Sequence, residues 1–166
     1  MSDPVFITLG SNIRPEENLQ AALTLLRADV SVLRISRIYE TEPVDSYGDK
    51  FLNAAVLIES ETPPGVLKFG MLRPIEALLG RVRTEDKNAP RTIDLDIALY
   101  GDTVIDNPDD QLVLPDPYIL TRAHVALPLA DLDPEFIHPV TGETLKHIAA
   151  RFAGQPGVTV HSLKLV

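Results

Sequence analysis

One segment, residues 92–100, constrains the fold most, because its apolar and polar residues alternate. Such alternation predicts a β-strand with two different faces. The first face carries the apolar residues Ile93, Leu95, Ile97 and Leu99. The second face carries Asp94, Asp96 and Ala98. Aspartate is disfavoured in strands, so two on one face, with Cα atoms roughly 6.6 Å apart, point to a functional surface.

Hydrophobic periodicity predicts five further elements before this strand. They are strands over residues 5–9, 30–40 and 51–61, and helices over residues 15–28 and 64–79. The resulting βαββαβ order is typical of a ferredoxin-like α+β sandwich. We expect an antiparallel sheet with both helices on one face, which leaves the other face for a site. Pro74 predicts a kink or restart in the second helix, and Gly80 is expected to end it.

The last third of the chain is predicted to add shorter elements to this core. They are a hairpin of residues 102–104 and 112–114, a helix over 121–132 broken by Pro128, an extended piece over 136–139, a helix over 144–152 and a strand over 158–165. No linker composition separates a second unit, and 166 residues suit one domain. We therefore predict a single domain over residues 1–166.

Charge and composition exclude several classes of function. The net charge of −9, from 24 acidic and 15 basic residues, argues against nucleic-acid and membrane partners. An RNA-binding sheet would also need paired aromatic residues, which the strands lack. The absence of cysteine excludes disulfides and thiolate chemistry. Without a membrane-length apolar run or a basic leader, we expect a cytoplasmic enzyme or binding protein.

The aspartate pair lies next to a cationic stretch that predicts an anionic ligand. Four basic residues fall between positions 81 and 91, namely Arg81, Arg83, Lys87 and Arg91. Paired carboxylates suit Mg²⁺, which completes its coordination with water and substrate phosphates. Guanidinium groups bind phosphate oxygens in a forked geometry. The alternatives are a solvated strand face and a solubilising loop. No phosphate-binding loop of the G-x-x-x-x-G-K-[ST] type is present.

A second candidate site lies in the predicted strand over residues 51–61. Phe51 and Asn53 have the same parity, so a flat heterocycle could stack on the ring and bond to the amide. The alternative is a polar group satisfied at a strand end. The turn at Gly10 after the first strand is a weak signal by itself. The four histidines show no metal-ligand spacing, and no nucleophile elbow is present.

Taken together, these pieces resemble the 6-hydroxymethyl-7,8-dihydropterin pyrophosphokinase family of folate biosynthesis. The matching segments run in family order over nearly the whole chain. They are L-G-S-N at 9–12, S-R-I-Y-E-T at 36–41, F-L-N at 51–53, I-E at 75–76, G-R-V-R at 80–83, P-R-T-I-D-L-D-I at 90–97, L-P at 114–115 and Arg122. The segment at 90–97 is highly specific for the family.

The resemblance implies transfer of the β,γ-diphosphoryl group of ATP to the pterin hydroxymethyl oxygen, with release of AMP. We expect a monomer with no nucleic-acid or membrane partner. The resemblance also implies that Asp94 and Asp96 hold two Mg²⁺ ions. Catalytic residues would be Arg81, Arg91, Asp94 and Asp96, and ATP-binding residues would be Arg81, Arg83, Arg91, Asp116 and Arg122. Pterin-binding residues would be Thr41, Pro43, Val44, Phe51, Asn53 and His124. Glu76 matches an acid on the site side of the second helix.

Several positions depart from the family pattern. Asp116 stands where the family usually has histidine, Asn88 replaces a common loop aromatic, and His124 replaces a stacking aromatic. Arg73 and Pro74 are also unusual on the second helix. These departures motivate an alternative function, in which a catalytically weakened relative binds a pterin or nucleotide without turnover.

Overall fold

The computed structural model describes residues 2–43, 49–85 and 90–166, and it is built around a six-stranded antiparallel sheet. The strands are β1 (Asp3–Ser11), β2 (Val32–Ile35), β3 (Tyr39–Thr41), β4 (Phe51–Ser60), β5 (Asp94–Tyr100) and β8 (Val158–Val160). Their order is β5-β1-β4-β3-β8, and β2 also pairs with β4. With β2 and β3 counted as one interrupted strand, this is the ferredoxin-like arrangement that the sequence predicts.

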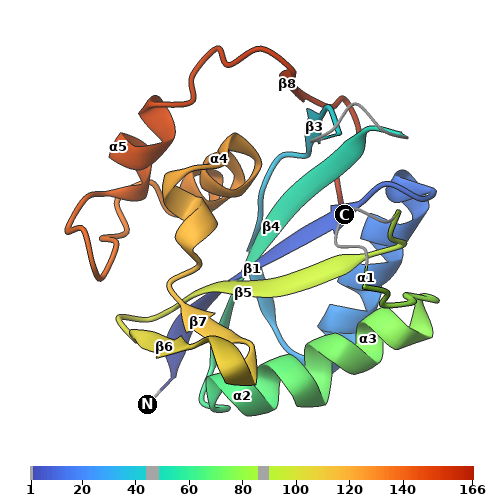
Figure 1. Cartoon of the computed structure of the whole chain (residues 1–166), viewed down its shortest axis with the longest axis horizontal. Helices are drawn as coiled ribbons and strands as arrows, with labels where there is room; N and C mark the ends of the chain where they lie inside the picture. Colours follow the sequence, from blue (N-terminus) through green and yellow to red (C-terminus); the bar gives the residue numbers. More distant parts are fainter. Residues whose placement is uncertain (1, 44–48, 86–89) are drawn as a thin grey trace.

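Helices α1 (Pro15–Asp29), α2 (Pro64–Leu67) and α3 (Arg73–Leu78) pack on one face of the sheet (Figure 1). Leu19, Leu23 and Leu26 of α1 are fully buried, as the helical spacing predicts. They meet strand residues of one parity, such as Ile7 and Leu95, in the larger hydrophobic core. This layer fixes the orientation of β1, β4 and β5 and sends alternate side chains to the opposite face.

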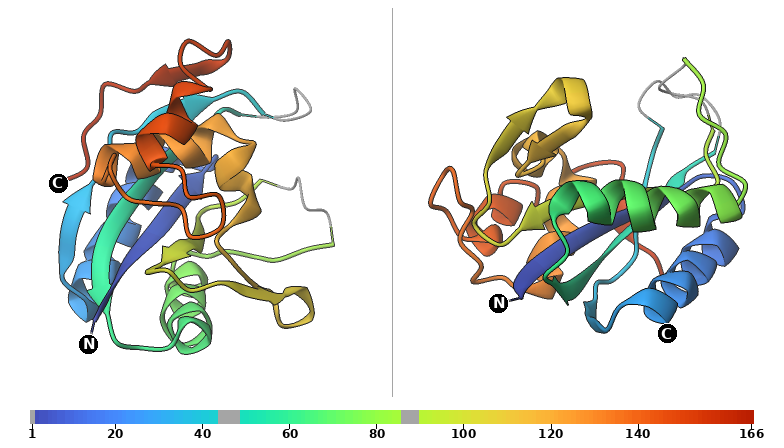
Figure 2. Two further views of the ribbon diagram at one scale, coloured as in Figure 1. Left: turned by 90° about the vertical axis from the view of Figure 1, so that its left-hand side faces the viewer. Right: turned by 90° about the horizontal axis from the view of Figure 1, so that it is seen from below.

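That opposite face is not free along its whole length, in contrast to our prediction. Helices α4 (Ala123–Leu132) and α5 (Leu145–Ala150) cover one part of it, so the sheet lies between two helical layers (Figure 2). A second core forms there around Phe6, whose ring meets Phe136 with centroids 4.8 Å apart. The uncovered part of this face carries Gly10, Asn53 and Asp94.

A bulge in β5 separates these two parts of the face. Phe6 pairs with Leu99 but Ile7 pairs with Ile97, so Ala98 is an additional residue in the ladder. The prediction that Leu99 shares a face with Ile97 is therefore wrong. Leu99 packs in the second core with Phe6, whereas Ile97 stays in the first. The predicted placement of Asp94 and Asp96 lies before the bulge and is unaffected.

The predicted strand over residues 30–40 is interrupted in the middle. Ser36 uses its backbone N–H to bind the carbonyl of Ala55, and its Oγ accepts the N–H of Ala55. The register against β4 changes by one residue between Ile35 and Tyr39 as a result. This break is what allows β3 to run beside Asn53 at the site end of β4.

The predicted second helix continues through Pro74 without a break, from α2 to α3, and contains one wide turn. The segment Lys68–Leu72 is π-helical, and the N–H of Arg73 donates to the carbonyl of Lys68, five residues back. A proline ring collides with a regular α-turn before it, and the wide turn relieves that collision. The helix ends at Gly80 as predicted: Gly80 donates to the carbonyl of Ala77, and Arg81 to that of Glu76.

The last third differs from prediction in its bounds. The hairpin consists of β6 (Ile105–Asn107) and β7 (Leu112–Leu114), so its first strand lies later than predicted. Pro128 does not break α4, because packing of Val125 and Leu129 on the second core holds the helix together. The helix predicted over residues 144–152 is the shorter α5, with Thr144 as its cap. The terminal strand is reduced to β8.

Candidate active site

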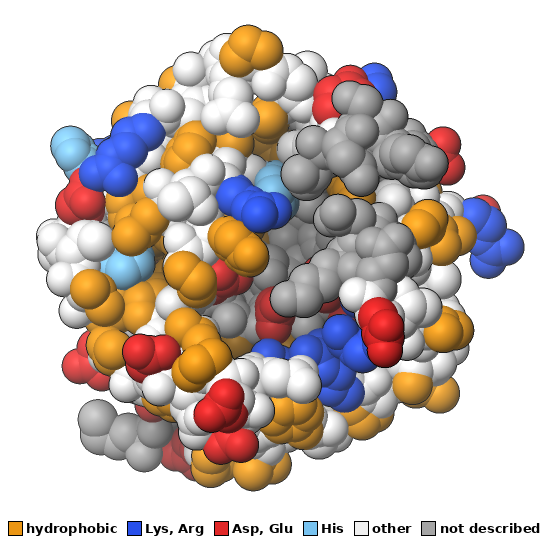
Figure 3. Space-filling model, viewed as in Figure 1, with side chains coloured by type: hydrophobic (Ala, Val, Ile, Leu, Met, Phe, Trp, Pro, Cys, Tyr) orange, Lys and Arg blue, Asp and Glu red, His pale blue; other side chains and the backbone are white. Residues whose placement is uncertain are grey.

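A cavity of about 740 Å³ opens on the uncovered part of the sheet. Strands β1, β4 and β5 form its floor, and the residues after α3 and before α4 form its walls. Figure 3 shows this face hollowed near its centre, with acidic side chains in the hollow and basic ones around it. Every predicted site residue that the structure describes lines this cavity: Thr41, Pro43, Phe51, Asn53, Arg81, Arg83, Arg91, Asp94, Asp96, Asp116, Arg122 and His124. Val44 and Asn88 lie outside the described residues.

Asp94 and Asp96 leave β5 on the same side, because side chains two residues apart in a strand share a face. Their side chains are 36% and 43% exposed, so both carboxylates reach the cavity. Desolvation on the cavity floor and the charge of Asp94 raise the pKa of Asp96, and the cations of Lys68 and Arg73 oppose that rise. The two carboxylates thus share one face of the cavity, each with a basic side chain beside it.

Glu76 of α3 organises the arginines around this pair from beneath the cavity. Its side chain is only 2% exposed. Oε1 accepts hydrogen bonds from Arg73 at 2.9 Å and from Arg83 at 2.6 Å. Oε2 lies 3.7 Å from Nη1 of Arg81. One buried carboxylate thus holds three guanidinium groups beside the aspartates.

Arg81 is fixed both by the helix end and by its side chain. The turn at Gly80 sets its backbone, and its Nη1 donates to the carbonyl of Ile93 at 2.6 Å and to Asp94 at 3.5 Å. Burial lowers the pKa of the guanidinium, with Asp94 and Glu76 opposing that change. Arginine nevertheless stays charged at neutral pH, so Arg81 places a positive charge next to Asp94.

Arg91 approaches Asp94 from the other side. Its Nη1 lies 3.3 Å from Oδ2 of Asp94, and its guanidinium lies 5.9 Å from the centre of the Phe51 ring. The backbone of Arg91 is anchored by Asn12, whose Oδ1 accepts its N–H at 2.7 Å and whose N–H donates to its carbonyl. The turn after β1, a weak signal in the sequence, therefore positions this arginine.

The wall before α4 combines Arg122 with three further side chains. The guanidinium of Arg122 lies 4.0 Å from the centre of the Tyr118 ring. Asp116 caps the 3₁₀ turn Pro117–Leu120 by accepting the N–H of Tyr118 at 2.9 Å. Burial raises the pKa of Asp116 to about 6, and this hydrogen bond opposes the rise. Burial and the charge of Arg122 lower the pKa of His124 to about 4, so its ring is neutral at pH 7.

Asn53 of β4 is held in one orientation at the other end of the cavity. Its Nδ2 donates to Oγ1 of Thr41 at 3.0 Å and to the carbonyl of Tyr39 at 3.3 Å, and the residue is buried. A Cβ atom at Gly10 would lie 3.3 Å from Oδ1 of Asn53. The absence of a side chain at Gly10 therefore gives the amide room, while Phe51 supplies a ring on the same side of β4.

Sequence reasoning missed several residues that line the cavity, chiefly Thr8, Asn12, Arg73 and Tyr118. Arg73 could have been found, because its spacing of three from Glu76 puts both on one helical face. Tyr118 and Asn12 lie in turns, whose direction local patterns do not determine. Their place in the site follows from tertiary packing alone.

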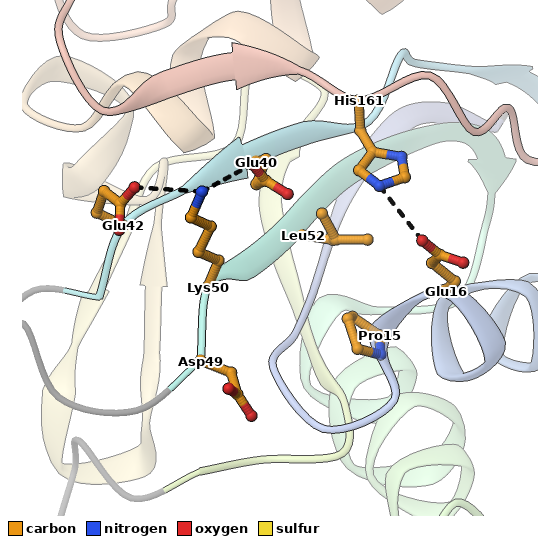
Figure 4. A pocket seen from close by; sticks show the side chains of 8 residues that line it. All are labelled: Pro15, Glu16, Glu40, Glu42, Asp49, Lys50, Leu52 and His161. Carbon is orange, nitrogen blue, oxygen red and sulfur yellow. Dashed lines mark hydrogen bonds and ion pairs between the residues drawn. The ribbon is translucent and has the colours of Figure 1, made fainter.

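A second hollow, of about 510 Å³, lies on the α1 side of the sheet (Figure 4). Lys50 points between Glu40 and Glu42, with ion pairs of 3.4 and 3.5 Å, and His161 faces Glu16 at 3.3 Å. No predicted site residue lines it. Most of its charged groups are paired with one another, and we interpret it as a solvated surface.

The residues of the main cavity fit a divalent metal that arrives with its substrate. In the described ranges, no three or more acidic or histidine side chains converge as a complete metal site. Two carboxylates, Asp94 and Asp96, are nevertheless available on one face. Mg²⁺ usually takes only one or two protein carboxylates and completes its octahedron with water and phosphate oxygens. The donor set is therefore suitable for a metal bound by a polyphosphate.

The fold and the cavity together define a ferredoxin-like α+β protein whose open sheet face joins an aspartate pair to several arginines. Comparison with known families then places the chain. The profile of 7,8-dihydro-6-hydroxymethylpterin-pyrophosphokinase matches residues 6–134, and the chain belongs to this family.

Curated relatives agree with this assignment. The chain is 42% identical over 137 residues to the 2-amino-4-hydroxy-6-hydroxymethyldihydropteridine pyrophosphokinase of Bacillus subtilis, covering 80% of this chain and 79% of the relative. It is 38% identical over 151 residues to the protein of that name from Methylorubrum extorquens, covering 88% and 91%. The folic acid synthesis protein fol1 of Pneumocystis carinii is 38% identical over 145 residues. The chain matches 85% of its own length there, but it spans only about a fifth of fol1 and of the Schizosaccharomyces pombe protein.

Solved structures support the fold. A crystal structure of Plasmodium falciparum HPPK-DHPS superposes with a TM-score of 0.71 at 16% identity, over 92% of this chain and 45% of that one. At that identity the likeness concerns the fold. In the part of the chain that the structure describes, no helix has the length and apolarity needed to cross a membrane.

Proposed function

We propose that this protein transfers the β,γ-diphosphoryl group of ATP to 6-hydroxymethyl-7,8-dihydropterin and releases AMP. The main support is the position of Asp94 and Asp96 among the arginines of one cavity, in a chain of the pyrophosphokinase family. The same cavity contains Asn53 and Phe51, which suit a flat, hydrogen-bonding ring. Thus one cavity supplies groups for both substrates.

The reaction needs charge neutralisation more than covalent help from the protein. The hydroxymethyl oxygen forms a bond to the β phosphorus, and the bond from that phosphorus to the oxygen bridging the α phosphate breaks. AMP leaves with that bridging oxygen, and the hydroxyl proton passes to solvent. Arg81, Arg83, Arg91 and Arg122 bind the phosphate oxygens and orient the chain of phosphates for this exchange.

We propose two Mg²⁺ ions as cofactors, held by Asp94 and Asp96. When bound, Mg²⁺ neutralises phosphate charge and polarises the phosphorus being attacked. Arg81 and Arg91 contact Asp94 in the structure. We propose that they exchange this carboxylate for phosphate oxygens when the nucleotide binds. The guanidinium groups then face the ligand, and the aspartate is released for the cation.

The pterin is proposed to bind between the ends of β3 and β4 and the start of α4. Asn53 and Thr41 would bind the hydrogen-bonding edge of the ring, with Pro43 beside it. Val44 stays a sequence-based proposal as a further pterin-binding residue. Phe51 and the neutral His124 would lie against its faces. The low pKa of His124 keeps this ring uncharged at neutral pH, which favours stacking over repulsion from Arg122.

We further propose that residues 1–166 act as one monomeric domain in the cytoplasm, where ATP is available. The second core supports a single domain, because α4 and α5 pack on the same sheet as α1. Gel filtration with light scattering tests the oligomeric state. A mass of twice that of the chain would contradict the monomer.

The activity is tested by incubating the protein with ATP, Mg²⁺ and 6-hydroxymethyl-7,8-dihydropterin, measuring AMP and identifying the pterin diphosphate by mass spectrometry. Asp96→Asn is expected to reduce turnover by at least about a hundredfold, because a metal-binding charge is lost. Asp109→Asn, in the exposed turn between β6 and β7, is the matched control and should leave turnover unchanged. Binding of both substrates without product at any Mg²⁺ concentration would identify the weakened relative instead.

A further inference from the structure

We infer that Lys68 is a tethered counter-ion of Asp96 that competes with a divalent metal for this carboxylate. The free protein would then bind the metal weakly and take it up together with the nucleotide. This inference rests on the proposed function in one respect, the assignment of Asp96 to the metal. It adds a positioning residue outside the segments that resemble the family.

Lys68 is a buried lysine with an acidic partner. Its side chain is 10% exposed, and its Nζ lies 3.5 Å from Oδ1 of Asp96. Nζ also donates to the backbone carbonyl of Gln111. Lysine is rarely buried unless its charge is paired, and Leu67 and Leu72 nearby belong to the hydrophobic core. The ammonium group is therefore committed to these oxygen atoms.

The π-helical turn explains how this cation reaches the sheet. Lys68 is the first residue of the turn, and its carbonyl accepts the N–H of Arg73. A π-turn adds one residue to a helix and shifts the faces of the residues before it relative to those after it. Lys68 and Arg73, which bracket the turn, consequently both reach β5. Nζ of Lys68 lies 3.5 Å from Oδ1 of Asp96, and Nη1 of Arg73 lies 3.5 Å from the carbonyl oxygen of Leu95.

The β6–β7 hairpin holds Lys68 in place from outside. Gln111 has a left-handed backbone, with φ 56°, directly before β7. Its carbonyl is thereby available to the Lys68 ammonium. Figure 2 shows this hairpin beside the helix that carries Lys68. A lysine held between hairpin and strand cannot move into solvent as an exposed one would, so its charge stays beside Asp96.

The position of Lys68 separates its role from that of the arginines. Arg81, Arg91 and Arg73 line the cavity, whereas Lys68 is not among its lining residues. It contacts Asp96 from the α2 side. Its charge therefore opposes a metal ion at Asp96 without giving a phosphate any direct contact. A metal that brings its own phosphate ligands overcomes this opposition more easily than the bare ion.

The experiment measures the binding of Mn²⁺ alone by calorimetry, with no nucleotide present. Lys68→Met removes the charge and is expected to tighten Mn²⁺ binding by about tenfold, since a unit charge a few ångströms from a divalent ion acts at that scale. Lys68→Gln keeps a hydrogen-bond donor toward Gln111 and should also tighten Mn²⁺ binding. Lys50→Met, which removes an exposed lysine near Glu40, is the matched control and should leave Mn²⁺ affinity unchanged.

The outcomes distinguish this inference from the proposed activity. Mn²⁺ binding that is unchanged or weaker in both folded Lys68 variants would overturn it, since Lys68 would then merely orient Asp96. Adding Asp96→Asn to Lys68→Met should abolish the gain, and a gain that persists would also overturn it. The Mn²⁺ titration needs neither ATP nor pterin. A missing diphosphotransfer activity therefore leaves its result interpretable.

Discussion

The backbone N–H of Leu95 donates a hydrogen bond of 2.9 Å to Oε2 of the buried Glu76. Leu95 stands between Asp94 and Asp96 in β5, so this bond ties α3 to the strand at the centre of the aspartate pair. The same carboxylate holds Arg73 and Arg83. Glu76 thus sets the spacing between the negative and positive parts of the site.

Glu76→Ala is expected to destabilise the fold by about 3 kcal/mol, because it leaves Arg73 and Arg81, 21% and 9% exposed, without this counter-charge and the Leu95 N–H without its acceptor. Urea unfolding measures the free energy. Glu76→Gln keeps an acceptor for Leu95 and should cost less. Glu17→Ala on the exposed face of α1 is the control, and a loss no larger than in that variant would refute the organising role of Glu76.

Asp116→Asn is expected to stabilise the protein at pH 8 by on the order of 2 kcal/mol and to have no effect at pH 4. The pKa of Asp116 rises from 3.8 to about 6 on folding. The folded state then binds the proton more tightly, so the wild type loses stability as pH rises from about 4 through 6. Asparagine retains the cap on Tyr118 and carries no charge. Unfolding curves at both pH values test this, and equal gains at pH 4 and pH 8 would contradict it.

The same substitution should also tighten ATP binding above pH 6. Asp116 carries a negative charge there and faces the cavity near Asp94 and Asp96, so it repels a triphosphate. Calorimetric titration with a non-hydrolysable ATP analogue at pH 8 is the measurement. Weaker binding by the asparagine variant would mean that Asp116 contributes a favourable contact.

His124→Phe is expected to protect the protein against acid. The pKa of His124 falls from 6.5 to about 4 on folding, so the unfolded chain binds the proton more tightly. Wild-type stability is lost as pH falls from about 6.5 through 4, by on the order of 2 kcal/mol for a partly buried ring. Phenylalanine cannot be protonated, so the variant does not lose this stability, and it keeps a flat ring at position 124. Melting temperatures at pH 7 and pH 4.5 should show a smaller drop for the variant.

Asn53→Ala should selectively weaken binding of the pterin substrate. The KM for the pterin is expected to rise by at least about tenfold, as for the loss of a well-placed hydrogen bond, while the KM for ATP stays within a factor of two. Steady-state kinetics with each substrate varied supply the test. Asn107→Ala, in the exposed β6 strand, serves as control, and an equal rise in both KM values would assign Asn53 a merely structural role.

Much of the fold follows from local patterns. The leucines of α1 lie at helical spacing, and the alternation before Ala98 defines both faces of β5. The predictions that failed depend on contacts with neighbouring strands. Ser36 interrupts its strand because it exchanges hydrogen bonds with Ala55 on β4. Leu99 changes face because β5 has one more residue than β1 at the bulge. Pro128 remains in α4 because tertiary packing outweighs the cost of a lost hydrogen bond.

The site was predictable to a similar degree and for a similar reason. Asp94, Arg81 and Asn53 lie in segments whose residue types carry the chemistry directly. The π-turn at Lys68 could not be anticipated in this form, because Pro74 predicts a disturbance in the helix without specifying its kind. The partners of Lys68, in β5 and in the hairpin, are remote in sequence and meet it only in the folded chain.

The extra residue at Ala98 has a consequence for how the protein can vary. Ahead of that bulge, Asp94 and Asp96 are constrained by ligand chemistry, whereas Leu99 beyond it is constrained by packing against Phe6 in the second core. Apolar substitutions in the second core around Phe6 should therefore leave the reaction unchanged, whereas substitutions of Asp94 or Asp96 should impair it. The thermal stability of the protein could therefore be raised by repacking the residues beyond the bulge, separately from the residues of the site.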